Sequence, residues 1–440
     1  MRLPEAFAPA VQIALLCREA GGRALLVGGA VRDLCMAETG GPQPRTPPDL
    51  DVEVHGIGHA VLRRLLARLG PVNLVGQAFS VYKLVLDGVL MDVSLPRRDS
   101  RAGPGHRGVH VEGDPSLGIR EAARRRDLTI NAIALDPLTG VLEDPFDGVG
   151  DLSRRLLKAV DPLTFGDDPL RALRVPQFAG RFGFTVHPDL NPLCRAMPLE
   201  ELPAERVRGE VRKLLLRSPR PSVGLDVGAR MGVWSRILPA LPSSDWDRCT
   251  ATVDRAAHLK DERYPEDEPR AEALLLAGLF AELSGPEVQD SLDRLAVYRQ
   301  DGFPLRQAVL ALVTQAARLP PDANDGALRL ASRTARPVGG LHLWLSAAQA
   351  ITGNPAFADL LARAVVLGVQ DAPPPPLIRG RDLRARGMPA SPEMGHLLEA
   401  ARQRQLETGE TDAEALLTWA IAATGSIGTP RPAQDDGSRG

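Results

Sequence analysis

Hydrophobic and polar residues follow two different periods along the chain. Up to about residue 137, short apolar runs and two-residue alternations stand between segments with the helical period. From Leu152 to Ala423 nearly every segment is rich in Leu, Ala and Arg at helical spacing, and prolines mark the joints. This pattern predicts an α/β head, built as a mixed sheet with flanking helices, followed by all-α domains.

The predicted elements of the head follow one another closely. We expect helices over about residues 8–20, 30–36, 59–69 and 119–126, and strands over 25–27, 49–54, 72–75, 81–86 and 90–95. Residues 128–135 form a further strand-like run. The stretch Arg97–Gly118 has five glycines, two prolines and little periodicity, so we expect a long mobile loop there.

The first candidate site is a glycine turn between a strand and a helix. Gly28 and Gly29 follow the apolar run Leu25–Val27, so the backbone can turn tightly and approach a ligand. The helix expected just beyond them would offer unpaired N–H groups and the positive end of its dipole. Such a turn suits a phosphate, and Arg32 would add a forked cationic donor.

The second candidate site is a pair of carboxylates on the next strand. Alternation puts Asp49 and Asp51 on one face and Leu50 and Val52 on the other. Two carboxylates at this spacing can bind the same divalent cations, and hard oxygen ligands suit magnesium. A phosphate cradle beside them suggests metal-assisted nucleotidyl transfer. For either motif alone, a plain turn or a solvated strand face is the commoner explanation.

A third candidate lies at the start of a predicted helix, with Pro169 at its first position. Asp168, Arg171 and Arg174 are spaced by three and would share one helical face. A carboxylate beside a guanidinium can accept from the amino group of cytosine or adenine and donate to the ring nitrogen. Guanine and uracil would present a carbonyl oxygen to the carboxylate instead. The alternative is that Asp168 only caps the helix and the arginines are solvated.

Composition and charge narrow the class of protein. The 440 residues suffice for about three domains with their own cores. A net charge of -2 argues against a polycation. With 4% aromatic residues, the composition does not indicate a platform on which the bases of a single strand would stack. Arginines crowd residues 120–220, while acids collect in 261–268 and 282–293. Such asymmetry can hide a nucleic-acid-binding stripe, although solvated helix faces explain any single arginine equally well.

The cysteines and the N-terminal residues bear on the compartment. No two of the cysteines form a CxxC pair, so we expect reduced thiols and no zinc knuckle in Cys17, Cys35, Cys194 and Cys249. Polar residues interrupt the apolar ones before residue 20, which does not match a secretory signal. No apolar run approaches the roughly 20 residues of a membrane span. We therefore expect a cytoplasmic protein without membrane contact.

Four motifs in order resemble one family, the class II tRNA nucleotidyltransferases, which comprise CCA-adding enzymes related to bacterial poly(A) polymerases. The motifs are Leu26–Asp33, Asp49–Asp51, Arg125–Ala132 and Asp168–Arg171. Residues 144–152 and Glu205-Arg206 with Glu210 resemble later motifs of that family. The resemblance is strong over about residues 25–213 and looser beyond.

The resemblance implies a role for each matching residue. Asp49 and Asp51 would ligate magnesium and be catalytic, with the RNA 3′-hydroxyl attacking the α-phosphorus. Asp168 and Arg171 would read the incoming base. The remaining nucleotide-binding residues would hold the triphosphate or sugar or order that segment, and they are Gly28, Gly29, Arg32, Arg126, Asn131 and Arg174. Asp92 could be a third carboxylate or merely a solvent contact at a strand end.

Some positions depart from the family pattern. Asp167 and Asp99 stand where glutamates are expected, and Gln177 stands where many relatives have arginine. Pro176 falls inside the predicted helix, where a kink would change how Arg174 points.

A separate departure lies further along the chain. Residues 246–259 and 273–283 resemble an HD phosphohydrolase domain. Its metal-binding positions align with Cys249 and Ala281-Glu282, which do not supply the histidines and the His-Asp pair that such a site needs. We predict a degenerate HD segment without phosphodiesterase or phosphatase activity.

The resemblance also implies an organisation and a function. We expect a nucleotidyltransferase head (1–137), a neck binding base and RNA (138–222), a degenerate HD-like body (223–372), a tRNA-binding tail (373–425) and a disordered end (426–440). The implied reaction is template-independent addition of C and A from CTP and ATP to the 3′-CCA end of tRNA, with no protein partner expected.

Four alternatives stay open. Two are split enzymes that add only CC or only A; the loop over 97–118 disfavours the first, while Pro176 leaves the second open. A poly(A) polymerase is disfavoured because such relatives usually have a more basic C-terminal part. The last is a catalytically silent RNA-binding paralogue.

Overall fold

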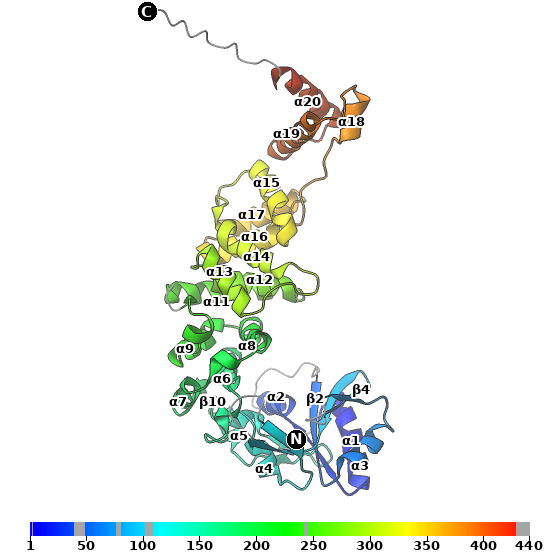
Figure 1. Cartoon of the computed structure of the whole chain (residues 1–440), viewed down its shortest axis with the longest axis vertical. Coiled ribbons are helices and arrows are strands. Elements are labelled where there is room, and N and C mark those ends of the chain that lie inside the picture. The colour runs from blue at the N-terminus through cyan, green and yellow to red at the C-terminus, as the bar shows by residue number, and fades with distance from the viewer. Residues whose placement is uncertain (2, 39–48, 76–80, 102–108, 242–244, 428–440) are drawn as a thin grey trace, which may run out of the picture. The chain divides into compact units, whose positions relative to one another are not determined.

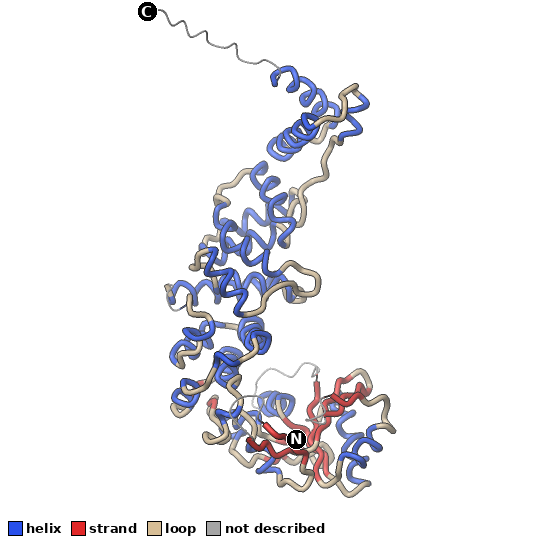
Figure 2. The backbone as a smooth tube through the Cα atoms, in the orientation of Figure 1, coloured by secondary structure: helices blue, strands red, loops and turns tan. Residues whose placement is uncertain are grey.

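The computed structural model describes all residues except 2, 39–48, 76–80, 102–108, 242–244 and 428–440. It divides into two compact units, Met1–Pro242 and Ser243–Gly440 (Figure 1). All strands of the described residues lie in the first unit, and the second is helical (Figure 2). The predicted fold class, an α/β head followed by helical segments, is therefore confirmed.

A seven-stranded sheet forms the centre of the head, with strands in the order β3-β4-β5-β2-β1-β8-β9. β2 and β5 run parallel, and the other neighbouring pairs are antiparallel, which gives the mixed sheet that was predicted. The strands are β1 (Arg23–Val27), β2 (Asp49–His55), β3 (Asn73–Val75), β4 (Val81–Leu86), β5 (Val89–Ser94), β8 (Ala134–Leu135) and β9 (Leu142–Glu143).

The two faces of this sheet differ in character. On one face the central strands bury apolar residues such as Leu50, Val52 and Met91. α1 (Ala8–Glu19) packs against β1, β2 and α3 (His59–Leu66). In Figure 1, α1 and α3 lie on one side of β2, and α2 (Gly29–Glu38) lies on the other. The second face carries the acidic residues of β2, because successive side chains of a strand alternate between faces.

The stretch predicted as a long mobile loop is partly a hairpin. β6 (Arg97–Arg101) pairs antiparallel with β7 (Val109–Gly113). Val109 and Val111 do alternate with polar residues, but this short period was outweighed in the prediction by the surrounding glycines and prolines. Asp99 falls in β6, and the middle of the stretch, 102–108, lies outside the described residues.

The strand predicted over 128–135 is also different. Thr129–Asn131 form a 3-10 helix, η3, and only Ala134-Leu135 pair with the sheet. The Thr129 hydroxyl donates to Asp151 at 2.7 Å, and the Asn131 amide donates to Asp127 at 3.0 Å. Such local side-chain bonds compete with the hydrogen-bond ladder of a strand. The apolar residues of this segment favoured a strand in the sequence, and the side-chain hydrogen bonds could not be predicted from it.

Helices complete the first unit after α4 (Ile119–Arg124). They are α5 (Gly148–Ser153), α6 (Arg171–Phe182), α7 (Leu190–Arg195), α8 (Ala204–Arg217), α9 (Pro221–Arg230) and α10 (Trp234–Ile237). The sequence predicted Pro169 at the first position of α6. In the structure α6 begins at Arg171, so Pro169 lies before the helix. Pro176 does lie inside α6, as predicted. Two short strands, β10 (Leu156-Leu157) and β11 (Thr185-Val186), pair in parallel.

α6 and α9 cross at very short range because glycines face each other. A Cβ placed on Gly224 would lie 2.3 Å from the Pro176 carbonyl oxygen, and one on Gly180 would lie 2.6 Å from Leu214 Cδ1. No side chain larger than hydrogen fits at these positions without displacement of the neighbour. The position of α6, which carries the candidate site residues Arg171 and Arg174, thus depends on this crossing.

The second unit consists of helices. They are α11 (Trp246–Arg263), α12 (Glu268–Leu279), α13 (Gly285–Arg294), α14 (Leu305–Gln315), α15 (Asp325–Ala335), α16 (Leu341–Thr352), α17 (Ala356–Val366), α18 (Gly380–Ala385), α19 (Pro392–Thr408) and α20 (Ala413–Ile427). The last three share an apolar cluster that includes Leu383, Leu397 and Leu416. Of the end predicted to be disordered, 426–427 belong to α20 and 428–440 lie outside the described residues.

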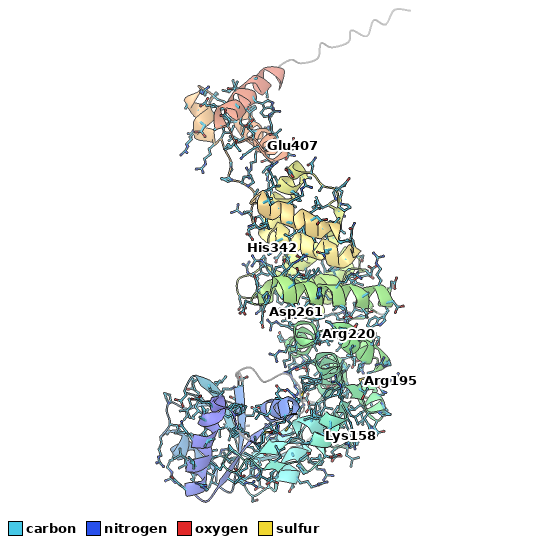
Figure 3. The ribbon with its side chains drawn as sticks, turned by 180° about the vertical axis from the view of Figure 1, so that it is seen from behind. Lys158, Arg195, Arg220, Asp261, His342 and Glu407 are labelled. Atoms are coloured by element: carbon cyan, nitrogen blue, oxygen red, sulfur yellow. The ribbon has the colours of Figure 1, made fainter. Side chains whose placement is uncertain are left out.

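A polar cluster connects the C-terminal end of α11 with α16 and the segment after α17. The Tyr264 hydroxyl lies 2.9 Å from His342 Nδ1 and 3.1 Å from the Ser346 hydroxyl, and His342 is labelled in Figure 3. Burial lowers the pKa of His342. Asp371 lies 3.5 Å from the other ring nitrogen. Among the described helices, none combines the length and the apolar character that crossing a membrane would require.

The predicted division into head, neck, body and tail stays a prediction. The first unit ends at Pro242, whereas the predicted boundary between neck and body at 222 falls inside α9. β9 belongs to the same sheet as β1, so the sheet reaches past the predicted end of the head at residue 137.

Candidate active site

The glycine turn lies directly beside the strand that carries the carboxylates. Val27, the last residue of β1, pairs with Asp51 of β2. Gly28 follows with a φ of +76°, a left-handed conformation that favours glycine. A Cβ placed on Gly28 would lie 3.1 Å from Asp51 Oδ2 and 3.5 Å from Arg126 Nη1. The missing side chain therefore leaves space in front of a carboxylate and a guanidinium, at the N-terminus of α2.

A row of polar side chains crosses the same face of the sheet. Asp51 pairs with Asp92 of β5, and Asp92 pairs with Lys83 of β4, so all three side chains point to one side. The Lys83 amino group lies 2.7 and 2.9 Å from the two oxygens of Asp92. Asp92 thus lies in the middle of β5 in an ion pair, and it is not the solvent contact at a strand end that was one of the two expectations.

Asp49 and Asp51 lie on the same face of β2, as the alternation predicted. Desolvation raises the pKa of Asp51, and the negative charges of Asp92 and Asp49 raise it further against the opposing effect of Arg126. A divalent cation would relieve this crowding of carboxylates, so the donor set fits a hard metal ion such as magnesium. Within the described part of the chain, no three His, Cys, Asp or Glu side chains are grouped to hold a metal.

Glu53 is a third acidic residue on this face of β2, and the sequence analysis missed it. It is buried, and Arg125 Nη2 lies 3.1 Å and Arg126 Nη2 3.8 Å from its Oε2 atom. Burial by itself would raise the pKa of Glu53, but His55 and the two arginines lower it to about 2. Glu53 therefore holds Arg126 in place beside Gly28. The period of two that identified Asp49 and Asp51 also includes Glu53 and could have found it.

Arg32 is buried next to the glycine turn, where a Cβ placed on Gly29 would lie 3.4 Å from its Nη2 atom. It is only 4% exposed, and its guanidinium donates to Asp33 at 2.8 Å and to Asn131 Oδ1 at 2.7 Å. Its guanidinium carbon lies 5.2 and 4.8 Å from the ring centroids of Phe178 and Phe182. The forked donor expected for a phosphate is thus already engaged with protein groups.

Asp127 connects this segment to α6. It accepts from Asn131 Nδ2 at 3.0 Å, from the Leu128 N–H at 2.7 Å and from Arg174 Nε at 2.5 Å. Burial alone would raise its pKa, but these three donors outweigh burial and lower the pKa to about 2. Since Asn131 also accepts from Arg32, one buried network runs from α2 through η3 to α6.

Asp168 and Arg171 do not form the helical fork that their spacing suggested. Asp168 has extended dihedrals and precedes α6, so it does not share a helical face with Arg171 and Arg174. Arg206 Nη2 lies 2.9 Å from Asp168 Oδ2, and the Leu170 N–H donates to Asp168 Oδ1 at 3.1 Å. The last contact is a turn ahead of α6, because the N-cap of α6 is Leu170 and no side chain caps it.

The guanidinium of Arg171 points to backbone carbonyls. It donates to Thr164 at 2.8 Å, to Phe165 at 3.3 Å and to Arg125. The structure thus brings together the glycine turn, both β2 carboxylates and Arg126. It connects Arg32, Asn131 and Arg174 through Asp127. Asp168 and Arg171 are bound to other groups of the first unit.

At the positions aligned with the HD metal ligands, the side chains bind other groups of the protein. Cys249 of α11 is buried, its thiol donates to the Leu279 carbonyl at 3.3 Å, and burial raises its pKa to about 12. Glu282 pairs with Arg248 at 2.9 Å. The absence of phosphohydrolase activity stays a prediction.

The head is similar to one known protein family. Residues 24–158 match the family described as the poly A polymerase head domain. This region contains the glycine turn, the β2 carboxylates and the segment around Arg126. The match and the relatives named below confirm the predicted resemblance to the class II tRNA nucleotidyltransferases.

The relatives are named for CCA addition. The chain is 37% identical over 223 residues to the multifunctional CCA protein of Xanthomonas campestris pv. campestris (strain B100), covering 49% of this chain and 50% of the relative. It is 36% identical over 248 residues to the CCA-adding enzyme of Bordetella pertussis, covering 54% of this chain and 62% of the relative. The matches thus span about half to three-fifths of these curated relatives.

Solved structures share the fold over nearly the whole chain. The Bacillus stearothermophilus CCA-adding enzyme in complex with CTP has a TM-score of 0.71 at 24% identity, covering 97% of this chain and 99% of that one. The Thermotoga maritima CCA-adding enzyme complexed with tRNA has a TM-score of 0.65 at 20% identity, covering 96% and 97%. At this level of identity the similarity establishes the fold.

Proposed function

We propose that this chain is an ATP(CTP):tRNA nucleotidyltransferase. It adds C and A from CTP and ATP to the 3′ end of tRNA without a nucleic-acid template and releases pyrophosphate. The proposal rests chiefly on one observation: Asp49 and Asp51 lie on one face of β2, and the Asp51 carboxylate is directly beside the Gly28 turn. The names of the relatives support the choice of tRNA, CTP and ATP as substrates.

The residues of the turn are suited to hold the triphosphate. The N–H groups at the start of α2 carry no intrahelical partner and favour an anion. Arg126 lies beside Gly28 and adds positive charge, and Glu53 keeps its guanidinium in place. Arg32 supports the turn indirectly, because its hydrogen bond to Asn131 fixes that residue to α2.

Asp49 and Asp51 are the residues that would hold magnesium. The bound ion would lower the pKa of the attacking 3′-hydroxyl and neutralise charge on the phosphates. Both carboxylates must be ionised to serve, and the raised pKa of Asp51 opposes this in the absence of a cation. Activity should therefore fall on acidification, as Asp51 takes up a proton.

Asp168 and Arg171 remain our proposed readers of the incoming base, and Arg174 remains the residue that steadies the nucleotide. In the structure Arg206 holds the Asp168 carboxylate and three carbonyls hold Arg171. Base reading therefore requires Arg171 to exchange at least one carbonyl for the ring nitrogen of the base. Arg171→Ala should relax the choice between C or A and the other bases.

The reaction is tested with three tRNA substrates, ending at the discriminator base, at -C and at -CC. Each is incubated with magnesium and radiolabelled CTP or ATP. Incorporation of both nucleotides supports CCA addition, and incorporation of one alone supports a split enzyme. No incorporation by a chain that still binds tRNA supports the silent paralogue and contradicts the proposal.

A pair of isosteric variants makes this test specific. Asp51→Asn should abolish incorporation while tRNA binding stays nearly unchanged, because the amide cannot replace the metal-binding charge. Asp87→Asn is the matched control, since Asp87 lies at the tight turn joining β4 and β5, away from the row of carboxylates. It should transfer nucleotides like the wild type. The tRNA contacts of the helical segments and the cytoplasmic location stay predictions, and we expect tRNA binding to weaken with salt.

A further inference from the structure

The acidic face of the head sheet, which carries Asp49 and Asp51, presents its strands in a fixed order. Across this face, from the glycine turn outward, the strands follow in the order β1, β2, β5 and β4. Gly28 stands at the β1 end and the two carboxylates stand on β2. The proposed triphosphate site and the proposed metal ligands therefore occupy the first half of the face, and β5 and β4 form the second half.

If the proposed function holds, the geometry of in-line displacement tells from which side of the sheet the RNA approaches. The attacking hydroxyl and the leaving pyrophosphate lie on opposite sides of the α-phosphorus. With the β- and γ-phosphates at the Gly28 turn and the α-phosphorus over β2, the hydroxyl must arrive from the side of β5 and β4. The last nucleotide of the RNA, which carries this hydroxyl, then lies over those two strands.

The surface found there fits such an occupant. Leu90 of β5 pairs with Asp49, and Val85 of β4 pairs with Leu90, so an apolar row continues directly from the first carboxylate. Val85 is 61% exposed and lies near the end of β4, next to the turn that joins β4 and β5. In the next row Lys83 is 38% exposed and pairs with Asp92. Lys83 forms a close ion pair with Asp92, and a lysine amine is charged at neutral pH.

We propose that Lys83, Val85 and Leu90, named here the primer platform, seat the 3′-terminal nucleotide of the RNA that is being extended. Val85 and Leu90 pack against the apolar face of its sugar and base. The Lys83 ammonium lies one row away, where it offsets Asp92 and attracts the phosphate that joins this nucleotide to the rest of the RNA. Val85 and Leu90 have no side-chain groups that read base edges, which suits a terminal nucleotide that changes after each addition.

The main test places a negative charge on the platform. Val85→Glu should raise the KM for tRNA ending in -C about tenfold, because the carboxylate repels the RNA backbone. Binding of CTP, measured by equilibrium dialysis, should stay unchanged, because the triphosphate lies at the other end of the face. Val85→Thr, which keeps the shape, should stay close to the wild type. The matched control is Val141→Glu, at a valine that is 54% exposed in the turn before β9.

A crosslink gives a second readout that does not depend on catalysis. A tRNA with 4-thiouridine as its last nucleotide is irradiated with the full chain, and the modified peptides are identified by mass spectrometry. We expect the crosslink in residues 81–92. A crosslink only elsewhere, or a Val85→Glu variant that behaves like Val141→Glu, overturns the platform and leaves the proposed function standing.

A failure of the proposed function can be distinguished from a failure of the primer platform alone. A wild-type chain that transfers no nucleotide overturns the proposed function and this inference with it. A Val85→Glu variant that loses CTP binding together with tRNA affinity also contradicts the inference, because the effect would then not be confined to the RNA. Circular dichroism of each variant establishes that it is folded.

Discussion

Asp127 gives the sharpest prediction, because a single carboxylate connects three elements around the site. Asp127→Asn keeps the shape of the side chain and removes its charge, so the Arg174 guanidinium loses its closest anion. The pKa of Asp127 is lowered from 3.8 to about 2 in the folded chain. A lowering of this size corresponds to roughly 2 kcal/mol of stabilisation by the ionised carboxylate.

The sign of the pH dependence follows from this lowered pKa. The stabilisation is fully present above about pH 4, where Asp127 is ionised in both the folded and the unfolded chain. It is lost as the pH falls from about 4 to about 2, because the unfolded chain then takes up the proton more readily. The difference in stability between the wild type and Asp127→Asn should therefore shrink to zero over this interval.

Hydrogen exchange followed by mass spectrometry measures the effect locally in the full chain. In Asp127→Asn, peptides that cover η3 and α6 should lose protection by roughly 30-fold at neutral pH, the equivalent of about 2 kcal/mol. Peptides of the second unit should be unchanged. Asp293→Asn is the control, because it removes the carboxylate of an exposed pair with Arg306 and should leave protection nearly unchanged. Protection of η3 and α6 within threefold of the wild type would refute the role given to Asp127.

Three further predictions concern glycines and thiols. Gly28→Ala should abolish nucleotidyl transfer and lower the free energy of unfolding by about 1 kcal/mol, because its Cβ meets Asp51 and φ is positive; rate assays and urea unfolding measure both. Gly224→Ala should lower the urea midpoint, by about 1–3 kcal/mol in free energy, since its Cβ lies 2.3 Å from a carbonyl oxygen, whereas Gly209→Ala, which faces open space in α8, should not. Thiol titration of the native chain at pH 8 should detect no reactive cysteine, because burial raises the pKa to about 11 or 12 in Cys17, Cys35, Cys194 and Cys249.

The sequence predicted those parts of the site that depend on local rules. The glycine turn and the carboxylates of β2 follow from positive φ and from the two-residue period, and the structure has both. Pairing between strands was not visible in the same way. That Asp92 and Lys83 lie in one row with Asp51 depends on the register of three strands, which a single sequence does not specify.

The base-reading residues show a second limit of the sequence. The spacing of Asp168 and Arg171 predicts one face only if both residues are helical, and α6 begins at Arg171. A proline two residues earlier was interpreted as the first helical position, although it equally fits a turn before the helix. The partners of Arg171 come from residues more than five positions away or from another segment, so no local pattern could have indicated them.

The alternation along β2 ties the chemistry of the head to its folding. Leu50, Val52 and Val54 supply the interior with apolar bulk, and the residues between them supply negative charge to the opposite surface. One codon inserted ahead of Leu50 would exchange the two sets, driving acids into the hydrophobic layer and aliphatic groups outward. Such a lesion would destroy the scaffold together with its reactivity, so an insertion in this strand cannot yield a well-folded but inert head.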